Sequence, residues 1–151
     1  MFRWIALGVT LGVLSAGTAY AQQPAAQAAT NTRVFASDAG LVLNFIKPDK
    51  TADFEAVIAK LKEAMQKSSK PERKQQAAGW KVFRSPDMAG ANVLYVFVID
   101  PNVKGADYSV ANLIAEGFPP DQVSAIYTQY AGAYAQGQNI INLTLLSDLG
   151  K

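Results

Sequence analysis

The 151-residue chain contains neither cysteine nor histidine. Without cysteine it has no disulfide, no thiolate metal ligand and no thiol nucleophile. Without histidine it lacks the commonest general base, the commonest metal ligand and the usual haem ligand. Ser-His-Asp and Cys-His catalysis are therefore excluded within this chain. We expect no metal and no cofactor, because the remaining carboxylates do not form an Asp-x-Asp-x-Asp-Gly calcium loop.

A large excess of charge of either sign is also missing. Lysine and arginine together number 14, against 12 aspartate and glutamate. The basic residues gather within positions 60–81, where acids are interleaved with them, which is typical of a solvated helix face. The sequence therefore predicts no nucleic-acid partner and no electrostatic attraction to an anionic membrane.

The first 21 residues have the pattern of a secretory signal peptide. Arg3 precedes an apolar run from Trp4 to Ala19, and Ala19-Tyr20-Ala21 resembles an Ala-x-Ala cleavage site. The run is shorter than the ~20 residues that a spanning helix requires. We expect export to the periplasm or the medium, cleavage after Ala21 and no stable membrane insertion afterwards. Residues 22–36 are predicted to be a flexible segment, because they begin with small and polar residues, and residues 37–151 are predicted to be the domain.

Long apolar runs are rare in the rest of the chain, and the longest is typical of a central strand. Residues 93–99 are all apolar or aromatic and four are β-branched, which suits a strand covered on both faces. Further strands are expected at 41–46, 80–84 and 139–146. Apolar residues at helical spacing predict a helix over 51–67 and a second helical region over 109–137. One or two helical turns are expected at 71–78.

The order strand, helix, strand, strand, helix, strand predicts an α+β fold of the ferredoxin-like β-α-β-β-α-β type. In this fold a four-stranded antiparallel sheet has its first and third strands at the centre and its helices on one face. The strand 93–99 is apolar on both sides, so the face away from the helices needs a cover. We expect that cover to be a second copy of the chain, related by a two-fold axis.

Residues 41–146 resemble the dimeric α/β-barrel superfamily in element order, in the apolar central strand and in the long helical region 108–137. The resemblance implies a homodimer in which two ferredoxin-like domains pack sheet against sheet around a cavity. The superfamily includes antibiotic-biosynthesis-type monooxygenases, haem-degrading enzymes and stress-response proteins, so the fold alone does not select a function. Haem-degrading members use a strand asparagine, a tryptophan and an iron-ligating histidine. Asn44 and Trp80 match the first two, but this chain has no histidine.

Five residues are candidates for binding a ligand. Asn44 is polar within an apolar strand, so it either lines a cavity between two sheets or bonds to a neighbouring side chain or water. Trp80 and Tyr108 offer rings for stacking, Arg84 offers a partner for a carboxylate, and Tyr95 offers a hydroxyl that donates a hydrogen bond or a proton. The alternatives are core or interface packing for the aromatic residues and an exposed edge position for Arg84.

Three functions fit this sequence. The predicted one is an exported, non-catalytic homodimer that binds a small apolar ligand between its sheets. The alternatives are a cofactor-independent monooxygenase or isomerase, and a structural or partner-binding module. An enzyme predicts a cavity with convergent polar groups, a binding protein predicts an apolar cavity, and a structural module predicts that large side chains fill the space.

Overall fold

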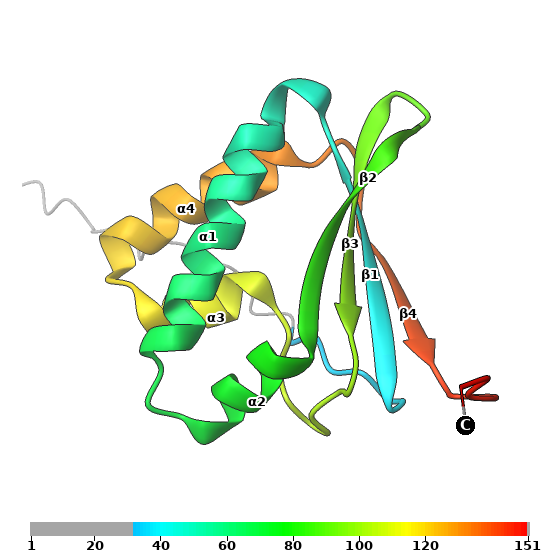
Figure 1. Ribbon diagram of the computed structural model, residues 1–151. Coiled ribbons are helices and arrows are strands. Elements are labelled where there is room, and N and C mark those ends of the chain that lie inside the picture. Colours follow the sequence, from blue (N-terminus) through cyan, green and yellow to red (C-terminus); the bar gives the residue numbers. More distant parts are fainter. Residues whose placement is uncertain (1–31, 151) are drawn as a thin grey trace, which may run out of the picture.

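The computed structural model describes residues 32–150, and the expected signal peptide lies outside them. The element order is β1 (Ala39–Ile46), a 3-10 turn (Pro48–Lys50), α1 (Thr51–Lys67), α2 (Pro71–Gly79), β2 (Trp80–Ala89), β3 (Asn92–Ile99), α3 (Val110–Gly117), α4 (Pro120–Ala133) and β4 (Asn139–Leu143). The strands form one antiparallel sheet in the order β2-β3-β1-β4, and the helices lie together on one face of it (Figure 1). The predicted α+β fold of the ferredoxin-like type is therefore confirmed. Within residues 32–150, no helix is long and apolar enough to cross a membrane.

Helix α1 covers the middle of the sheet. Its apolar stripe is buried against the strands and against α3 and α4, and comprises Phe54, Val57, Leu61 and Met65. Phe54 is fully buried, and its ring lies 4.7 Å from that of Tyr95 and 6.2 Å from that of Phe97, measured between centroids. The helix has the bounds that the apolar spacing predicts, because one regular stripe runs along its whole length.

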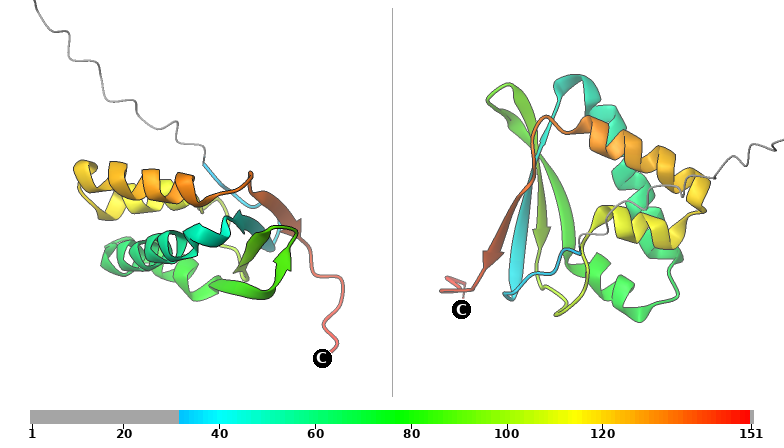
Figure 2. Two further views of the ribbon diagram at one scale, coloured as in Figure 1. Left: turned by 90° about the horizontal axis from the view of Figure 1, so that it is seen from above. Right: turned by 180° about the vertical axis from the view of Figure 1, so that it is seen from behind.

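Burial alternates along both central strands, so each strand presents one set of side chains to the helices and another to the opposite face. The helix-facing set is almost completely buried: Val42, Asn44 and Ile46 on β1, and Val93, Tyr95, Phe97 and Ile99 on β3. The opposite set is half-buried and apolar. The core therefore lies on one side of the sheet, and the other side carries no helix (Figures 1 and 2).

Two predicted strand ends were wrong, and β1 begins at Ala39, two residues before its predicted start. Strand β2 extends to Ala89 instead of stopping at Arg84, because a bulge between Arg84 and Met88 absorbs the residues that suggested a turn. The turn itself is confined to Gly90 and Ala91, with Gly90 at φ 66°. Strand β4 ends at Leu143 rather than Leu146, since its only neighbour, β1, begins at Ala39, opposite Leu143.

The domain also begins earlier than residue 37. Phe35, which we placed in the flexible segment, is 2% exposed and packs edge to face with Tyr108. Its ring lies over Gly40 so closely that a Cβ there would be 2.1 Å from it. Asn102 holds the same segment by donating to the carbonyls of Phe35 and Ser37. Residues 33–38 are thus part of the folded domain.

A short tail follows β4 and projects away from the helices, beyond the open side of the sheet (Figure 2). Three leucines in it are largely in water, with exposed fractions of 75% for Leu145, 99% for Leu146 and 96% for Leu149. These leucines make the tail an apolar segment that the rest of the fold does not cover.

Candidate functional site

Asn44 lies at the centre of a polar cluster on the helix-covered face of the sheet. It is fully buried, and its amide donates to the carbonyls of Val42 and Tyr95. Its oxygen accepts hydrogen bonds from Tyr134 at 2.9 Å and from Gln138 at 2.6 Å. Of the two roles that the sequence left open for Asn44, the one in a cavity between two sheets does not hold, because Asn44 shares its face with Val42 and Ile46, which α1 and α4 cover. Its bonds to neighbouring side chains are the alternative use that the sequence left open.

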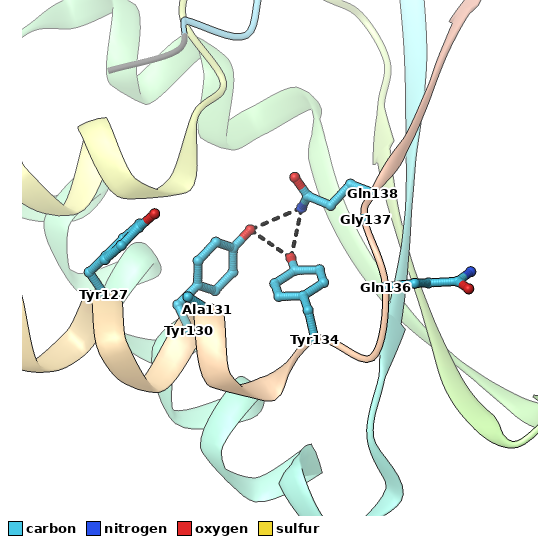
Figure 3. Close-up of a pocket in the computed structure, with 7 residues that line it drawn as sticks. All are labelled: Tyr127, Tyr130, Ala131, Tyr134, Gln136, Gly137 and Gln138. Atoms are coloured by element: carbon cyan, nitrogen blue, oxygen red, sulfur yellow. Dashed lines mark hydrogen bonds between the residues drawn. The ribbon is translucent and has the colours of Figure 1, made fainter. Parts of the chain in front are cut away.

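The cluster continues into a surface groove at the end of α4 (Figure 3). The Tyr134 hydroxyl lies 2.7 Å from that of Tyr130, and the Gln138 amide nitrogen is 3.0 Å and 2.7 Å from the hydroxyls of Tyr130 and Tyr134. The two rings pack edge to face, with centroids 5.0 Å apart. The groove has a volume of about 390 Å³ and is lined by Tyr127, Tyr130, Ala131, Tyr134, Gln136, Gly137 and Gln138. Its polar atoms are phenol and amide groups.

Burial sets the protonation of these tyrosines. Removal from water raises the pKa of Tyr134, and the neighbouring Tyr130 raises it further. Burial likewise raises the pKa of Tyr130, while the bond to Tyr134 and the nearby Arg33 guanidinium lower it in part. Both hydroxyls therefore stay protonated at neutral pH and act as neutral hydrogen-bonding groups rather than as bases.

Tyr95 and Arg84 lie in the same cross-strand row as Asn44, since the register pairs Asn44 with Tyr95 and Tyr95 with Arg84. The Tyr95 hydroxyl donates to the Glu55 carboxylate on α1, and Arg84 also binds this carboxylate at 3.1 Å. Burial, reinforced by Glu55, raises the pKa of Tyr95 to about 12. Arg84 and Glu55 are both exposed, so this ion pair lies at the surface, at the edge of the buried Tyr95 ring.

Trp80 and Tyr108 form a separate group near the opposite end of the sheet. The Trp80 ring lies 5.4 Å from Tyr108 and 5.5 Å from Phe97, centroid to centroid. Tyr108 is 1% exposed, and its hydroxyl accepts a bond from the Val103 backbone. Trp80 is only half-buried, but no partner within residues 32–150 accepts its buried indole N–H. The packing is that of a core, so these two rings do not border the groove at α4.

A second buried polar network lies on α2 and α3. The sequence did not predict it, because its members look like isolated charged residues. Arg73 is 7% exposed and binds Glu116 through two nitrogens, at 3.1 Å and 2.7 Å. It also donates to Gln76, which in turn donates to the Asp107 carbonyl at 3.0 Å. The bidentate pair holds α2 against α3, since a buried guanidinium needs such partners. Arg73 and Glu116 are 43 positions apart along the chain, so their pairing could not be predicted from the sequence.

The open face of the sheet is a further candidate surface. Its side chains are apolar across all the strands: the register pairs Leu41–Val98, Leu43–Val96 and Phe45–Leu94 at the centre, with Phe83 and Ile141 on the edges. Phe83 is 52% exposed and Ile141 39%. Polar residues on this face, namely Lys81, Asn92 and Asn139, lie on edge strands or at a strand end. Of the five residues predicted to bind a ligand, none points to this face.

The described residues offer little for catalysis. Within positions 32–150, no group of three His, Cys, Asp or Glu side chains is placed to hold a metal ion. The polar cluster around Asn44 is satisfied internally, and its hydroxyls remain neutral.

No protein-family model matches this chain, and neither the curated proteins nor the solved structures contain a match. The resemblance to the dimeric α/β-barrel superfamily stays a prediction, and the function has to be argued from the surfaces described above.

Proposed function

We propose that this chain is an exported, non-catalytic homodimer whose two sheets pack face to face and enclose a small apolar ligand. The observation that carries the proposal is the apolar open face, which covers all strands of the sheet while every helix lies on the other side (Figure 1). An uncovered apolar face of this kind is costly in water. A two-fold contact presents the same face from both copies, so the surface has to complement only itself.

The size of the face fits a dimer. Four strands ~4.8 Å apart, with central strands of eight residues at ~3.3 Å each, give a flat area of roughly 500 Å². Side-chain relief makes the accessible area larger than this, and a standard interface buries about 800 Å² per partner. The tail that carries the exposed leucines runs on the same side of the sheet as the open face (Figure 2). A second copy therefore supplies enough area without a further subunit.

The character of the face supports an apolar ligand rather than a substrate. An enzyme needs polar groups that converge on a reacting atom, whereas the central positions of this face are leucine, valine and phenylalanine. Lys81 and Asn139 lie on the two edge strands, on opposite sides of those positions. The oxygenase or isomerase alternative would need Asn44, Tyr95 or Trp80 in the cavity. All three lie on the helix-covered face instead, where Asn44 bonds to Tyr134, Tyr95 bonds to Glu55 and Trp80 packs on Phe97.

A neutral apolar dye tests the proposal. N-phenyl-1-naphthylamine, whose fluorescence rises in apolar surroundings, should bind the purified protein with one dye per two chains. Val96→Asp, which places a carboxylate at the centre of the open face, should abolish this binding while the helical circular-dichroism signal is retained. Lys81→Asp, at the edge of the same face, is the matched control and should retain most of it. Dye binding that Val96→Asp leaves unchanged would overturn the proposal.

A further inference from the structure

Strand β4 forms one edge of the sheet. It stands at the end of the order β2-β3-β1-β4 and pairs with β1 alone (Figure 1). Beyond the bonds within the sheet, no backbone-to-backbone hydrogen bond among residues 32–150 involves positions 139–146. The contacts of this segment to residues 36 and 37 use the side chains of Asn142 and Thr144. The outer side of β4 therefore keeps its backbone donors and acceptors free for a further strand.

The two edges of the sheet differ in how strongly they resist such pairing. On the opposite edge, β2 carries Lys81, Arg84 and Pro86 and contains a bulge before Met88. Charged side chains, proline and bulges are the features by which edge strands avoid pairing with other chains. The segment 139–146 has no charge and no proline, and its register with β1 is regular. The edge at β4 is therefore open to pairing, whereas the edge at β2 is not.

The end of this segment has the sequence of a strand but no neighbour. The sequence predicts a strand over 139–146, yet β4 ends at Leu143, opposite the first residue of β1. A strand supplied by another chain would continue the pairing over residues 144–146. Such a strand would also contact the four exposed apolar side chains of the segment, which are Ile140 (47%), Ile141 (39%), Leu145 (75%) and Leu146 (99%).

We propose that β4 pairs antiparallel with β4 of a second copy across a two-fold axis at Leu143, so that the two sheets of the homodimer join into one sheet of eight strands. In this register Leu143 lies opposite the same residue of the second copy. Each apolar side chain then meets an apolar one, and each polar side chain meets a polar one. The further pairs between the copies are Ile141–Leu145, Ile140–Leu146, Asn142–Thr144 and Asn139–Ser147.

Neighbouring registers lack this match. An axis at Asn142 would place Ile140 opposite Thr144. An axis at Thr144 would place Asn142 opposite Leu146. The hydrophobic pattern sets the register of paired strands, so it selects the axis at Leu143. Paired positions in that register differ by an even number, so they belong to the same face of the joined sheet, and the helices of both copies lie on its other face.

This pairing rests on the proposed homodimer, because two short strands are too weak a contact to hold two chains together by themselves. It specifies how the two sheets meet. A sheet of eight strands that curls about the β4 pair turns the two open faces towards each other. Eight strands closed in this way leave an interior that accommodates one small ligand, as the proposed function requires.

Single cysteines test the register, and the chain is a clean background because it has no cysteine of its own. The two copies of Leu143→Cys would lie directly opposite each other, with Cα atoms ~5 Å apart, within reach of a disulfide. Ile141→Cys is the matched control, since its two copies would be four residues apart along the strands, or about 13 Å. Oxidation with diamide should cross-link Leu143→Cys into covalent dimers and leave Ile141→Cys as single chains on a non-reducing gel. Equal cross-linking of the two variants, or none in either, would overturn the register.

A charge on the tail tests the pairing without a cysteine. Lysine on an edge strand opposes pairing, so Leu146→Lys, opposite Ile140 of the second copy, should raise the dissociation constant of the dimer at least about tenfold. Leu149→Lys is the matched control, because Leu149 is 96% exposed, nearly as much as Leu146, but lies beyond the paired segment. Sedimentation equilibrium measures both dissociation constants, and equal values would overturn the pairing.

The failure of this pairing and the failure of the homodimer give different results. A single-chain mass for the unaltered protein would contradict the homodimer and the pairing together. Twice the chain mass, with no cross-link in Leu143→Cys, would retain the homodimer and overturn the β4 pairing alone.

Discussion

At the scale of single residues, Asn44 shows how a polar side chain is accommodated inside this core. Both its amide hydrogens and its oxygen are used, so its burial costs little. A leucine of similar size would leave the Tyr134 hydroxyl and the Gln138 amide without their shared acceptor. Asn44 is therefore a structural residue that fixes the end of α4 on β1.

We predict that Asn44→Leu lowers the free energy of unfolding by about 2–3 kcal/mol, because the Tyr134 hydroxyl and the Gln138 amide lose a hydrogen-bond acceptor inside the protein. Urea unfolding measures the change. The double variant Asn44→Leu with Tyr134→Phe should cost less than the sum of the two single variants, since both remove the same bond. Strict additivity would show that the two side chains are not coupled.

Tyr95 makes stability depend on alkaline pH. Its pKa is about 12 in the folded protein against an ordinary value of 10.0, mainly because it is buried and also because it bonds to Glu55. The unfolded chain therefore loses this proton first, and the contribution of Tyr95 is complete below pH 10 and lost as pH rises towards 12. Urea unfolding at pH 8, 10 and 11 should show falling stability.

The Tyr95→Phe variant is the control for this pH dependence. Phenylalanine cannot ionise, so the fall in stability between pH 10 and 11 should be shallower, and the buried Tyr108, Tyr130 and Tyr134, whose pKa values are also raised, contribute to the remaining fall. An identical slope in the variant would contradict the assignment to Tyr95.

At the scale of elements, the close approach of α1 and α3 depends on a glycine. A Cβ on Gly117 would lie 2.6 Å from the Ala64 Cβ and 2.8 Å from its Cα, and neither atom can move without moving its helix. Gly117 also ends α3, where Phe118 takes an extended conformation. Small residues at this crossing allow the two helices to pack over the sheet.

We predict that Gly117→Ala lowers the melting temperature, at a cost of about 1–3 kcal/mol for the overpacked contact. Gly132→Ala is the matched control, since a Cβ on that helical glycine meets nothing within 4 Å. It should raise stability by up to about 1 kcal/mol through helix propensity alone. Calorimetry of both variants gives the comparison, and equal effects would contradict the close contact.

The elements themselves could be predicted from the sequence wherever a regular pattern runs through them. Helix α1 has one apolar stripe from end to end, and β3 has an unbroken apolar run, so both were predicted well. The end of β2 could not be predicted in this way. A bulge places Ser85, Pro86 and Asp87 within the strand, although these residue types are typical of a turn. The end of β4 depends on where its partner begins, which is a tertiary property.

The candidate site was less predictable, for reasons of orientation and distance along the chain. Alternation shows which residues share a face of a strand, but not which face the helices cover, so the sequence left two roles open for Asn44, in a cavity between sheets or in a hydrogen bond to a neighbouring group. The partners Tyr130, Tyr134 and Gln138 were visible only as a helical tyrosine stripe followed by polar residues. Arg33 lay in a stretch that composition assigned to a flexible segment, although Phe35 anchors it in the core.

At the scale of the whole molecule, the helices cover one face of the sheet and leave the other face open. The helices bury the aromatic centre around Phe54, and the opposite face of the sheet keeps its leucines, valines and phenylalanines at the surface together with the leucines of the tail. The proposed homodimer accounts for both apolar surfaces with one contact.

The native mass of the purified protein, measured by light scattering, tests the proposed dimer most directly. The account predicts twice the mass of the chain, and the mass of a single chain for Val96→Asp, which puts a charge in the centre of the contact. Phe97→Asp distinguishes the two faces, because Phe97 is 1% exposed beneath α1 and its replacement should unfold the protein rather than dissociate it. A single-chain mass for the unaltered protein at micromolar concentration would contradict the account.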